Sequence, residues 1–218
     1  MRIAVLGTGM VGQVIASKLI SLGHQVTMGA REAGNEKAVA WAGTHGAGAR
    51  EGSFADAVAG AEMVINATSG AHSLEALEQA REGLAGKVLV DVANPLDFSG
   101  GFPPTFTVAN TDSLGEQIQR AFPGARVVKA LNTVNCDVMV EPSRVPGRHD
   151  TFVCGDDEAA KAEVTALLES FGWPADAVID LGDISAARAL EMYVALWLRL
   201  FTRFGTPAVS IAVVRGSE

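Results

Sequence analysis

Charged and metal-binding residues are scarce in this sequence of 218 residues. Only 19% of the residues are charged, four are histidine and two are cysteine, and the formal net charge is −8. Because nucleic-acid binding needs clustered lysine and arginine, and no such cluster is present, we expect no nucleic-acid partner. Cys136 and Cys154 have neither the spacing of a metal site nor that of a disulfide framework, which fits a reducing compartment. We predict no metal site and a cytoplasmic location.

Long apolar stretches are missing as well. The first strand-like run, RIAVL, is too short and too soon interrupted by glycine to be a signal peptide. The longest apolar run, ALEMYVALWLRLF, contains Glu191 and Arg199 and is too short to span a bilayer. Since 48% of the residues are hydrophobic, the chain can still bury a core. We therefore expect a folded protein with no membrane partner.

The chain contains a regular alternation of strand and helix patterns. Continuous apolar runs predict strands, and segments with helical spacing or a helix-capping start predict helices between them. The expected strands are 2–6, 25–30, 61–68, 87–95 and 125–133, and the expected helices are 11–22, one starting at Ser53, 74–81 and 113–122. Such alternation predicts an α/β fold with a Rossmann-type, doubly wound parallel sheet.

The composition changes to proline, glycine and charge over 141–150, where we place a domain boundary. The first domain is predicted over 1–142 and a small C-terminal α/β extension over 143–218. The extension contains two strand patterns, a helix over 159–172 and a long helix over 184–201. The long helix is apolar on more than one face, so it packs on the main sheet or on a second copy in a homodimer. The last residues, 206–218, could add an edge strand.

A glycine-rich loop, Gly7-Thr8-Gly9-Met10-Val11-Gly12, follows the first strand directly and opens an amphipathic helix. In a dinucleotide fingerprint the first glycine permits the tight turn, the second lets the backbone approach a pyrophosphate, and the third lets helix and strand pack closely. The helix N-terminus offers free N–H groups and a partial positive charge to the phosphates. This context predicts a dinucleotide site.

The end of the second strand indicates which dinucleotide is bound. An NAD site normally has an acid there for the ribose 2′-hydroxyl, whereas this sequence has Ala30 and Arg31. A guanidinium can pair with a 2′-phosphate through charge-assisted hydrogen bonds, so we predict NADP(H). Glu32 follows directly and would be the missing acid if the strand ended one residue later. Lys37 is a candidate second positive charge.

Three further segments follow strands and should meet at the same sheet edge, where ligands bind in such folds. They are rich in small and amide side chains suited to a ribose or a carboxamide. They consist of Asn66, Ala67, Thr68 and Ser69, of Ala93, Asn94 and Pro95, and of Asn132 and Thr133.

No catalytic acid or base is evident in the sequence. There is no Tyr-x-x-x-Lys pair, His72 suits a surface role at a helix start, and Cys136 suits a packed position. We therefore predict no catalytic residue and a small-molecule hydride acceptor that is itself a ring. Direct transfer between two rings needs alignment and exclusion of water, and no side chain has to donate a proton in step with it.

Several motifs together resemble the NADPH-dependent oxidoreductases of the deazaflavin coenzyme F420. They are GTGMVG at 7–12, GAR at 29–31, DVANPL at 91–96, VKALNT at 128–133 and the C-terminal pattern from FVCGDDEAAKAEV to VIDLGDISAARALE. The chain is also similar to the reductase domain of the six-transmembrane metalloreductases. The resemblance covers nearly the whole chain, and VKALNT and the C-terminal pattern are more specific than the glycine loop.

The resemblance implies reversible hydride transfer between NADP(H) and coenzyme F420 in a dimer. Residues 8–12, Ala30 and Arg31 would then hold the phosphates and the adenosine ribose, and residues in the loops 66–69, 93–95 and 132–136 would line the nicotinamide and the acceptor. Two departures bear on this. Ala30 stands where the family usually has serine, which removes a hydroxyl donor to the 2′-phosphate. NATSGAHS, at 66–73, replaces a more apolar, proline-containing loop of many members, so the acceptor could differ.

Two other functions remain open at this point. A reductase of the same fold could act on a flavin, a metal ion or a small carbonyl or imine substrate, although relatives that reduce imines usually have a larger helical C-terminal domain. A non-catalytic NADP-binding sensor would bind the nucleotide tightly without turning over any acceptor.

Overall fold

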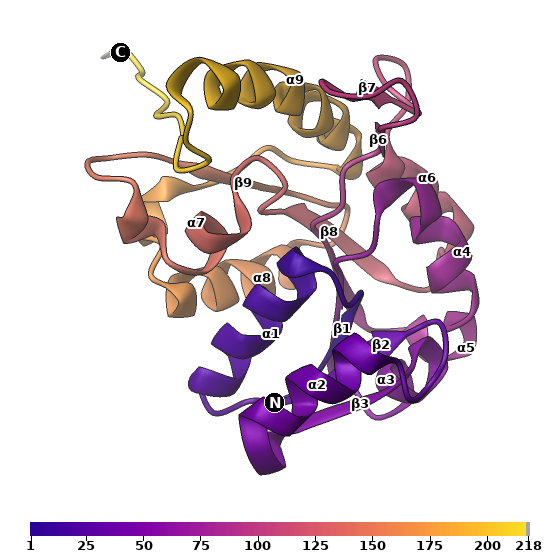
Figure 1. The fold of residues 1–218 in the computed structure, drawn as a ribbon. Helices are drawn as coiled ribbons and strands as arrows, with labels where there is room; N and C mark the ends of the chain where they lie inside the picture. The colour runs from indigo at the N-terminus through magenta and orange to yellow at the C-terminus, as the bar shows by residue number, and fades with distance from the viewer. Residues whose placement is uncertain (217–218) are drawn as a thin grey trace.

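The computed structural model describes residues 1–216 and contains one large sheet with helices on both of its faces (Figure 1). The strands of this sheet are β1 (Arg2–Leu6), β2 (Gln25–Ala30), β3 (Ala49–Ser53), β4 (Met63–Asn66), β5 (Val88–Asp91), β8 (Arg126–Ala130), β9 (Thr151–Cys154) and β10 (Val178–Asp180). A small hairpin consists of β6 (Leu96–Asp97) and β7 (Thr105–Phe106). The helices are α1 (Met10–Ser21), α2 (Glu36–His45), α3 (Phe54–Ala59), α4 (Ser73–Glu78), α5 (Arg81–Leu84), α6 (Leu114–Ala121), α7 (Cys136–Val140), α8 (Glu158–Phe171) and α9 (Ala187–Phe204).

The strand order is β10-β9-β8-β5-β4-β1-β2-β3, which confirms the predicted doubly wound α/β fold. All neighbouring pairs are parallel except β8 and β9, which are antiparallel. The chain first proceeds from β1 to β2 and β3, then crosses to the other side of β1 to form β4. This reversal is a topological switch point, and ligands of such sheets bind beyond the carboxyl ends of the strands there.

The continuous apolar run of β1 is explained by burial on both faces. Ile3 and Val5 point into the core beneath α1 and α2, whereas Ala4 and Leu6 point into the core on the side of α3 and α4. Successive side chains of a strand point to opposite faces, so a strand covered on both sides has to be apolar throughout.

Most expected elements are present with shifted ends. Ser53 and Asp56 form the predicted capping box at the start of α3. The helix expected over 74–81 is instead α4, which ends at Glu78, followed by the short α5. The strand β3 was not predicted, because its sequence, AREGS, has no alternation of apolar and polar residues. It forms one edge of the sheet. The helix α2 and the hairpin β6–β7 were also missed.

The C-terminal segment joins the main sheet, because β9 pairs with β8 and β10 pairs with β9. Helix α9 lies at one end of the molecule, above β8 and β9 in the view of Figure 1. Residues 206–216 form no strand, so the expected edge strand is wrong over this range; residues 217–218 lie outside the described part. The tail is fixed by other contacts, since Asp150 N donates to Ile211 O at 2.8 Å. Among the described helices none has the length and apolar character needed to cross a membrane.

Candidate functional site

The glycine loop lies between β1 and α1, at the switch point. Gly7 has φ of +118°, and a Cβ on it would be 2.4 Å from Ala67 O. A Cβ on Gly12 would be 2.1 Å from Gly7 O, so α1 can approach the loop only without a side chain there. A Cβ on Gly9 would meet nothing within 4 Å. Gly7 and Gly12 are therefore required by the fold, whereas Gly9 leaves open space in front of the helix.

The start of α1 is suited to an anion. Gly9 is its N-cap, so no side chain caps the first turn, and that turn contains no acidic residue. The unpaired N–H groups of a first turn, together with the helix dipole, favour negative charge. The side chain of Gln13 donates to Thr8 O at 2.9 Å and holds the loop against the helix.

One hollow of about 380 Å³ lies on the β2 side of the loop. Ala30 and Arg31 from the end of β2 reach it, and His72 and Ala76 line it from the region of α4. The side chain of Arg31 is 66% exposed, and its guanidinium lies 3.7 Å from Glu75 Oε1 on α4. Lys37 lies exposed in the first turn of α2 and is not among the residues that line this hollow in the described chain.

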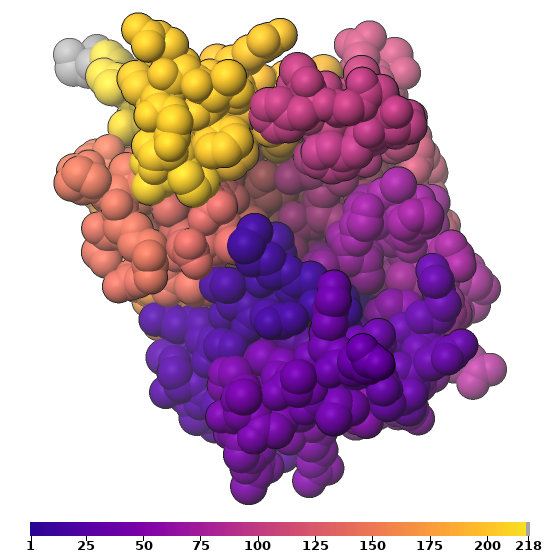
Figure 2. All heavy atoms as spheres, viewed as in Figure 1, coloured from indigo at the N-terminus to yellow at the C-terminus, as the bar shows by residue number. Residues whose placement is uncertain are grey.

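A second hollow, of about 260 Å³, lies on the β4 and β5 side of the loop. The two hollows share Ala67, Thr68 and Ser69, so they form one continuous groove past the glycine loop. Figure 2 shows the surface hollowed between the start of α1 and the hairpin β6–β7. The second hollow is lined by Met10, Val11, Ala67, Thr68, Ser69, Gly70, Val92, Ala93, Asn94, Leu96, Phe98, Asn132, Val134, Asn135, Cys136 and Met139.

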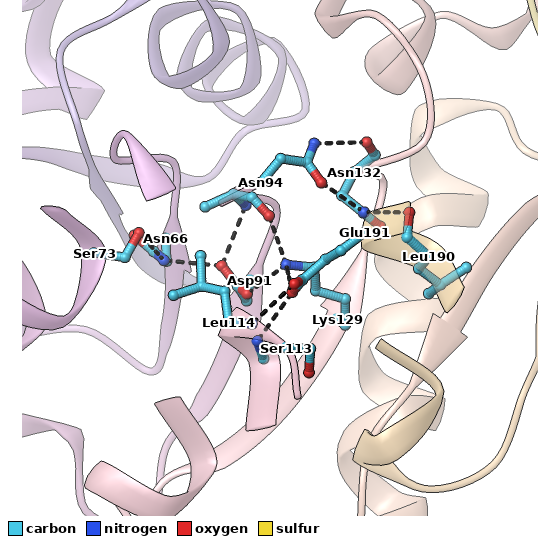
Figure 3. A network of polar contacts seen from close by, with 12 residues as sticks. Asn66, Ser73, Asp91, Asn94, Ser113, Leu114, Lys129, Asn132, Leu190 and Glu191 are labelled. Carbon is cyan, nitrogen blue, oxygen red and sulfur yellow. Dashed lines mark hydrogen bonds and ion pairs between the residues drawn. The ribbon is translucent and has the colours of Figure 1, made fainter. Parts of the chain in front are cut away.

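A buried ionic cluster lies next to Asn94 and Asn132, two residues that line the second hollow (Figure 3). The ammonium of Lys129 is fully buried and contacts Asp91 Oδ2 at 2.8 Å and Glu191 Oε1 at 2.7 Å. It also donates to Ala93 O, one residue before Asn94. A buried charge is stable only where it is paired and hydrogen-bonded, and here all three charged groups are. The cluster therefore fixes the loop after β5 at the edge of the hollow.

The cluster extends to two helices and to β4. Glu191, on α9, accepts hydrogen bonds from Leu114 N at 2.8 Å and Gly115 N at 3.0 Å, at the start of α6. Asp91 accepts from Asn66 Nδ2 at 2.9 Å, at the end of β4. The ends of three strands and the C-terminal helix are thus joined in one polar network (Figure 3).

Two predicted site residues that line the hollow are hydrogen-bonded to each other. Asn94 Nδ2 donates to Asn132 O and Asn132 Nδ2 donates to Asn94 Oδ1, each at 2.9 Å. Asn132 Nδ2 also donates to Leu190 O of α9 at 3.1 Å. The Oδ1 atom of Asn132 is buried and has no hydrogen-bond partner in the described chain, although the residue lines the hollow. An acceptor of this kind is suited to a ligand N–H group.

The electrostatics of the cluster follow from burial and charge. Burial alone would lower the pKa of Lys129, but Asp91 and Glu191 together outweigh it and raise that pKa, so the side chain stays charged. Burial raises the pKa of Glu191 in spite of Lys129. Burial, followed by the neighbouring Asp137, also raises the pKa of the Cys136 thiol, so this residue is no activated nucleophile.

The structure brings most of the predicted residues to the groove, but it adds three that the sequence reasoning missed. Asp91, Lys129 and Glu191 were not predicted to belong to the site. The available signal was a charged residue inside otherwise apolar patterns, VLVD, VVKA and ALEMYVAL. Three predicted residues, Asn66, Pro95 and Thr133, are buried and are not among the described residues that line either hollow. Residues 1–216 contain no cluster of three or more side chains able to hold a metal ion.

The switch point, glycine loop and continuous groove define the class: a dinucleotide-binding protein of the doubly wound α/β type. The family model described as NADP oxidoreductase coenzyme F420-dependent matches residues 2–95. A crystal structure from Arthrobacter sp. FB24, provisionally assigned as an F420-dependent NADP reductase, is 51% identical and has a TM-score of 0.92. It covers 99% of this chain and 100% of its own.

Curated relatives are less similar in sequence. The F420-dependent NADP reductase of Methanocaldococcus jannaschii is 29% identical over 161 residues, which are 72% of this chain and 70% of the relative. The metalloreductase STEAP3 of Rattus norvegicus is 28% identical over 208 residues. That match takes in 95% of this chain but only 38% of the rat protein. The chain belongs to the family of F420-dependent NADP oxidoreductases.

Proposed function

We propose that this protein transfers a hydride between the nicotinamide of NADP(H) and the deazaflavin ring of coenzyme F420, directly from ring to ring. One observation supports direct transfer without a proton donor from the protein. Among the described residues that line the second hollow, the only ionisable side chain is Cys136, and its pKa is raised by burial. A carbonyl or imine reductase needs a proton donor at the reacting atom, whereas transfer between two rings does not depend on one.

The residues of the groove fit the two halves of NADP(H). The open space at Gly9 and the uncapped start of α1 suit the pyrophosphate. Arg31 suits the 2′-phosphate, and the unpartnered Oδ1 of Asn132 suits the carboxamide of the nicotinamide. When bound, the two cofactors supply the redox chemistry. The chain holds the rings, excludes water with apolar side chains such as Met10, Val92 and Met139, and keeps Asn94 and Asn132 in place through the Lys129 cluster.

The proposal is tested by a paired absorbance assay with purified protein. NADPH or NADH is mixed in turn with the oxidised deazaflavin, FMN or FAD, and the oxidation of each reduced nucleotide is followed. We expect turnover of the deazaflavin with NADPH, slower turnover with NADH, and little with the flavins. Turnover of a flavin in preference to the deazaflavin would replace the proposed acceptor. Tight NADPH binding without any turnover would favour a sensor function.

We also propose a cytoplasmic homodimer in which 1–142 binds NADP(H) and 143–218 contributes acceptor-side and dimer contacts. Met192, Leu196 and Phe204 of α9 are large apolar side chains that are 39%, 53% and 64% exposed. Exposed apolar side chains grouped on one surface are typical of an interface. The chain has a mass of 22.6 kDa, and sedimentation velocity at micromolar concentration should give twice this mass. The variant Leu196→Glu should sediment as a monomer. A monomer at all concentrations for the unmodified protein would contradict the proposal.

A further inference from the structure

A carboxylate lies opposite Arg31 at the mouth of the first hollow. The guanidinium of Arg31, at the end of β2, is 3.7 Å from Glu75 Oε1 on α4. The other carboxylate oxygen of Glu75 is 3.8 Å from Nδ1 of His72. All three side chains are more than half exposed. The ion pair thus bridges the two elements between which the adenosine end of a dinucleotide would enter.

This carboxylate opposes any anion that Arg31 would bind. While Glu75 is paired with the guanidinium, a phosphate must displace it or share the cation with it. Once the phosphate is bound, the like charges repel each other at short range. Glu75 is the one carboxylate within ion-pair distance of Arg31 among residues 1–216. The neighbouring acid Glu51 is turned to the loop after β2, where it accepts from Gly34 N at 2.9 Å.

We infer that Glu75 is a specificity-determining residue that acts against Arg31. It weakens the binding of 2′-phosphorylated nucleotides and so narrows the preference for NADP(H) over NAD(H) that Arg31 creates. Ala30 has no hydroxyl that could donate to the 2′-phosphate. The preference for NADP(H) over NAD(H) therefore depends on the opposite charges of Arg31 and Glu75. This inference rests on the proposed binding of NADP(H) in the groove.

The test is the variant Glu75→Gln, with Glu78→Gln as the matched control. Both residues lie on α4 and both substitutions remove one negative charge, but Glu78 pairs with Arg81 and not with Arg31. Dissociation constants are measured by calorimetry for NADPH and NADH, and for the fragments 2′,5′-ADP and 5′-AMP. Thermal melting checks that each variant is folded.

For Glu75→Gln we expect NADPH and 2′,5′-ADP to bind about two- to five-fold more tightly, as for the loss of one exposed ionic interaction. NADH and 5′-AMP should bind as before, Glu78→Gln should change nothing, and the gain should shrink at high salt because exposed charges are screened. Weaker NADPH binding in Glu75→Gln, or an equal change for NADH, would overturn the inference.

Arg31→Ala separates failure of this inference from failure of the proposed NADP(H) site. It should weaken NADPH binding about ten-fold, corresponding to 1.4 kcal/mol, and leave NADH nearly unchanged. If it does so while Glu75→Gln has no effect, the NADP(H) site stands and the role of Glu75 is refuted. If Arg31→Ala affects both nucleotides equally, the assignment of the 2′-phosphate to Arg31 fails.

Discussion

Replacing Lys129 by methionine should lower the free energy of unfolding by about 3–5 kcal/mol, the range found when one partner of a buried ion pair is removed. The variant leaves Asp91 and Glu191 buried without their counter-charge, since both side chains are almost inaccessible to solvent. Methionine fills nearly the same volume, so the loss reports the charge and its hydrogen bonds and not a cavity. Urea unfolding followed by circular dichroism measures it.

Lys161→Met is the matched control for this effect. Lys161 is also nearly buried, but its partners Glu158 and Asp180 are 84% and 43% exposed and remain solvated when it is removed. We expect a loss of about 1 kcal/mol or less, as for a surface ion pair. Equal losses in the two variants would show that the Lys129 cluster has no special role.

The effect of Lys129→Met should also depend on pH in a defined direction. Burial already raises the pKa of Glu191 above its usual value in the unmodified protein. Without Lys129 the pKa of Glu191 in the folded state rises further. At pH values between the ordinary pKa of a glutamate and this raised pKa, the folded state therefore binds more protons than the unfolded state. Stability of the variant must then increase as the pH is lowered through this range. Adding Glu191→Gln to Lys129→Met should reduce this dependence, because it removes the contribution of Glu191.

Gly9→Ala should weaken dinucleotide binding strongly and spare the fold, whereas Gly12→Ala should damage both. At Gly9 the new methyl group meets no protein atom within 4 Å, and the residue has φ of −76°, which alanine adopts without strain. The methyl group occupies the space through which the pyrophosphate would reach the start of α1. We expect a loss of about a hundred-fold in NADPH affinity, 2.7 kcal/mol, with a change in stability below about 1 kcal/mol.

At Gly12 the methyl group would lie 2.1 Å from Gly7 O, a backbone atom that cannot rotate away. Overpacking of this kind costs about 1–3 kcal/mol and displaces α1 from the loop. Calorimetric titration with NADPH and thermal melting of both variants distinguish the two roles. Unchanged NADPH affinity in a folded Gly9→Ala protein would mean that the pyrophosphate does not lie at this helix start.

The C-terminal segment contributes contacts that hold the residues at the edge of the second hollow. Glu191 completes the charge cluster below the groove, and Leu190 O accepts a hydrogen bond from Asn132 at its edge. Helix α9 is thus in direct contact with Asn132 and, through Lys129, is connected to the loop that carries Asn94. The division at residue 142 stays a prediction, but the groove depends on contacts from both sides of it.

Local patterns were sufficient for the alternation of strands and helices, the glycine loop and the residues at the strand ends. Each of these features leaves a signal in a few consecutive residues. A strand that is buried on both faces, such as β1, has to be a continuous apolar run, and the turn at Gly7 requires a residue without a side chain. The edge strand β3 and the course of 206–216 were not predictable in this way, because their sequences carry no period that separates strand from loop.

By itself, the sequence determined the doubly wound fold and the position of the dinucleotide loop, because backbone sterics and hydrophobic periodicity act over a few residues. Only the tertiary structure decided that Asp91, Lys129 and Glu191 neutralise one another, and that Glu75 lies opposite Arg31. Lys129 and Glu191 are 62 positions apart in the chain numbering, and Arg31 and Glu75 are separated by two strands and two helices. Pairing of charges depends on distance in space, and that distance is set only when the sheet brings the strand ends together.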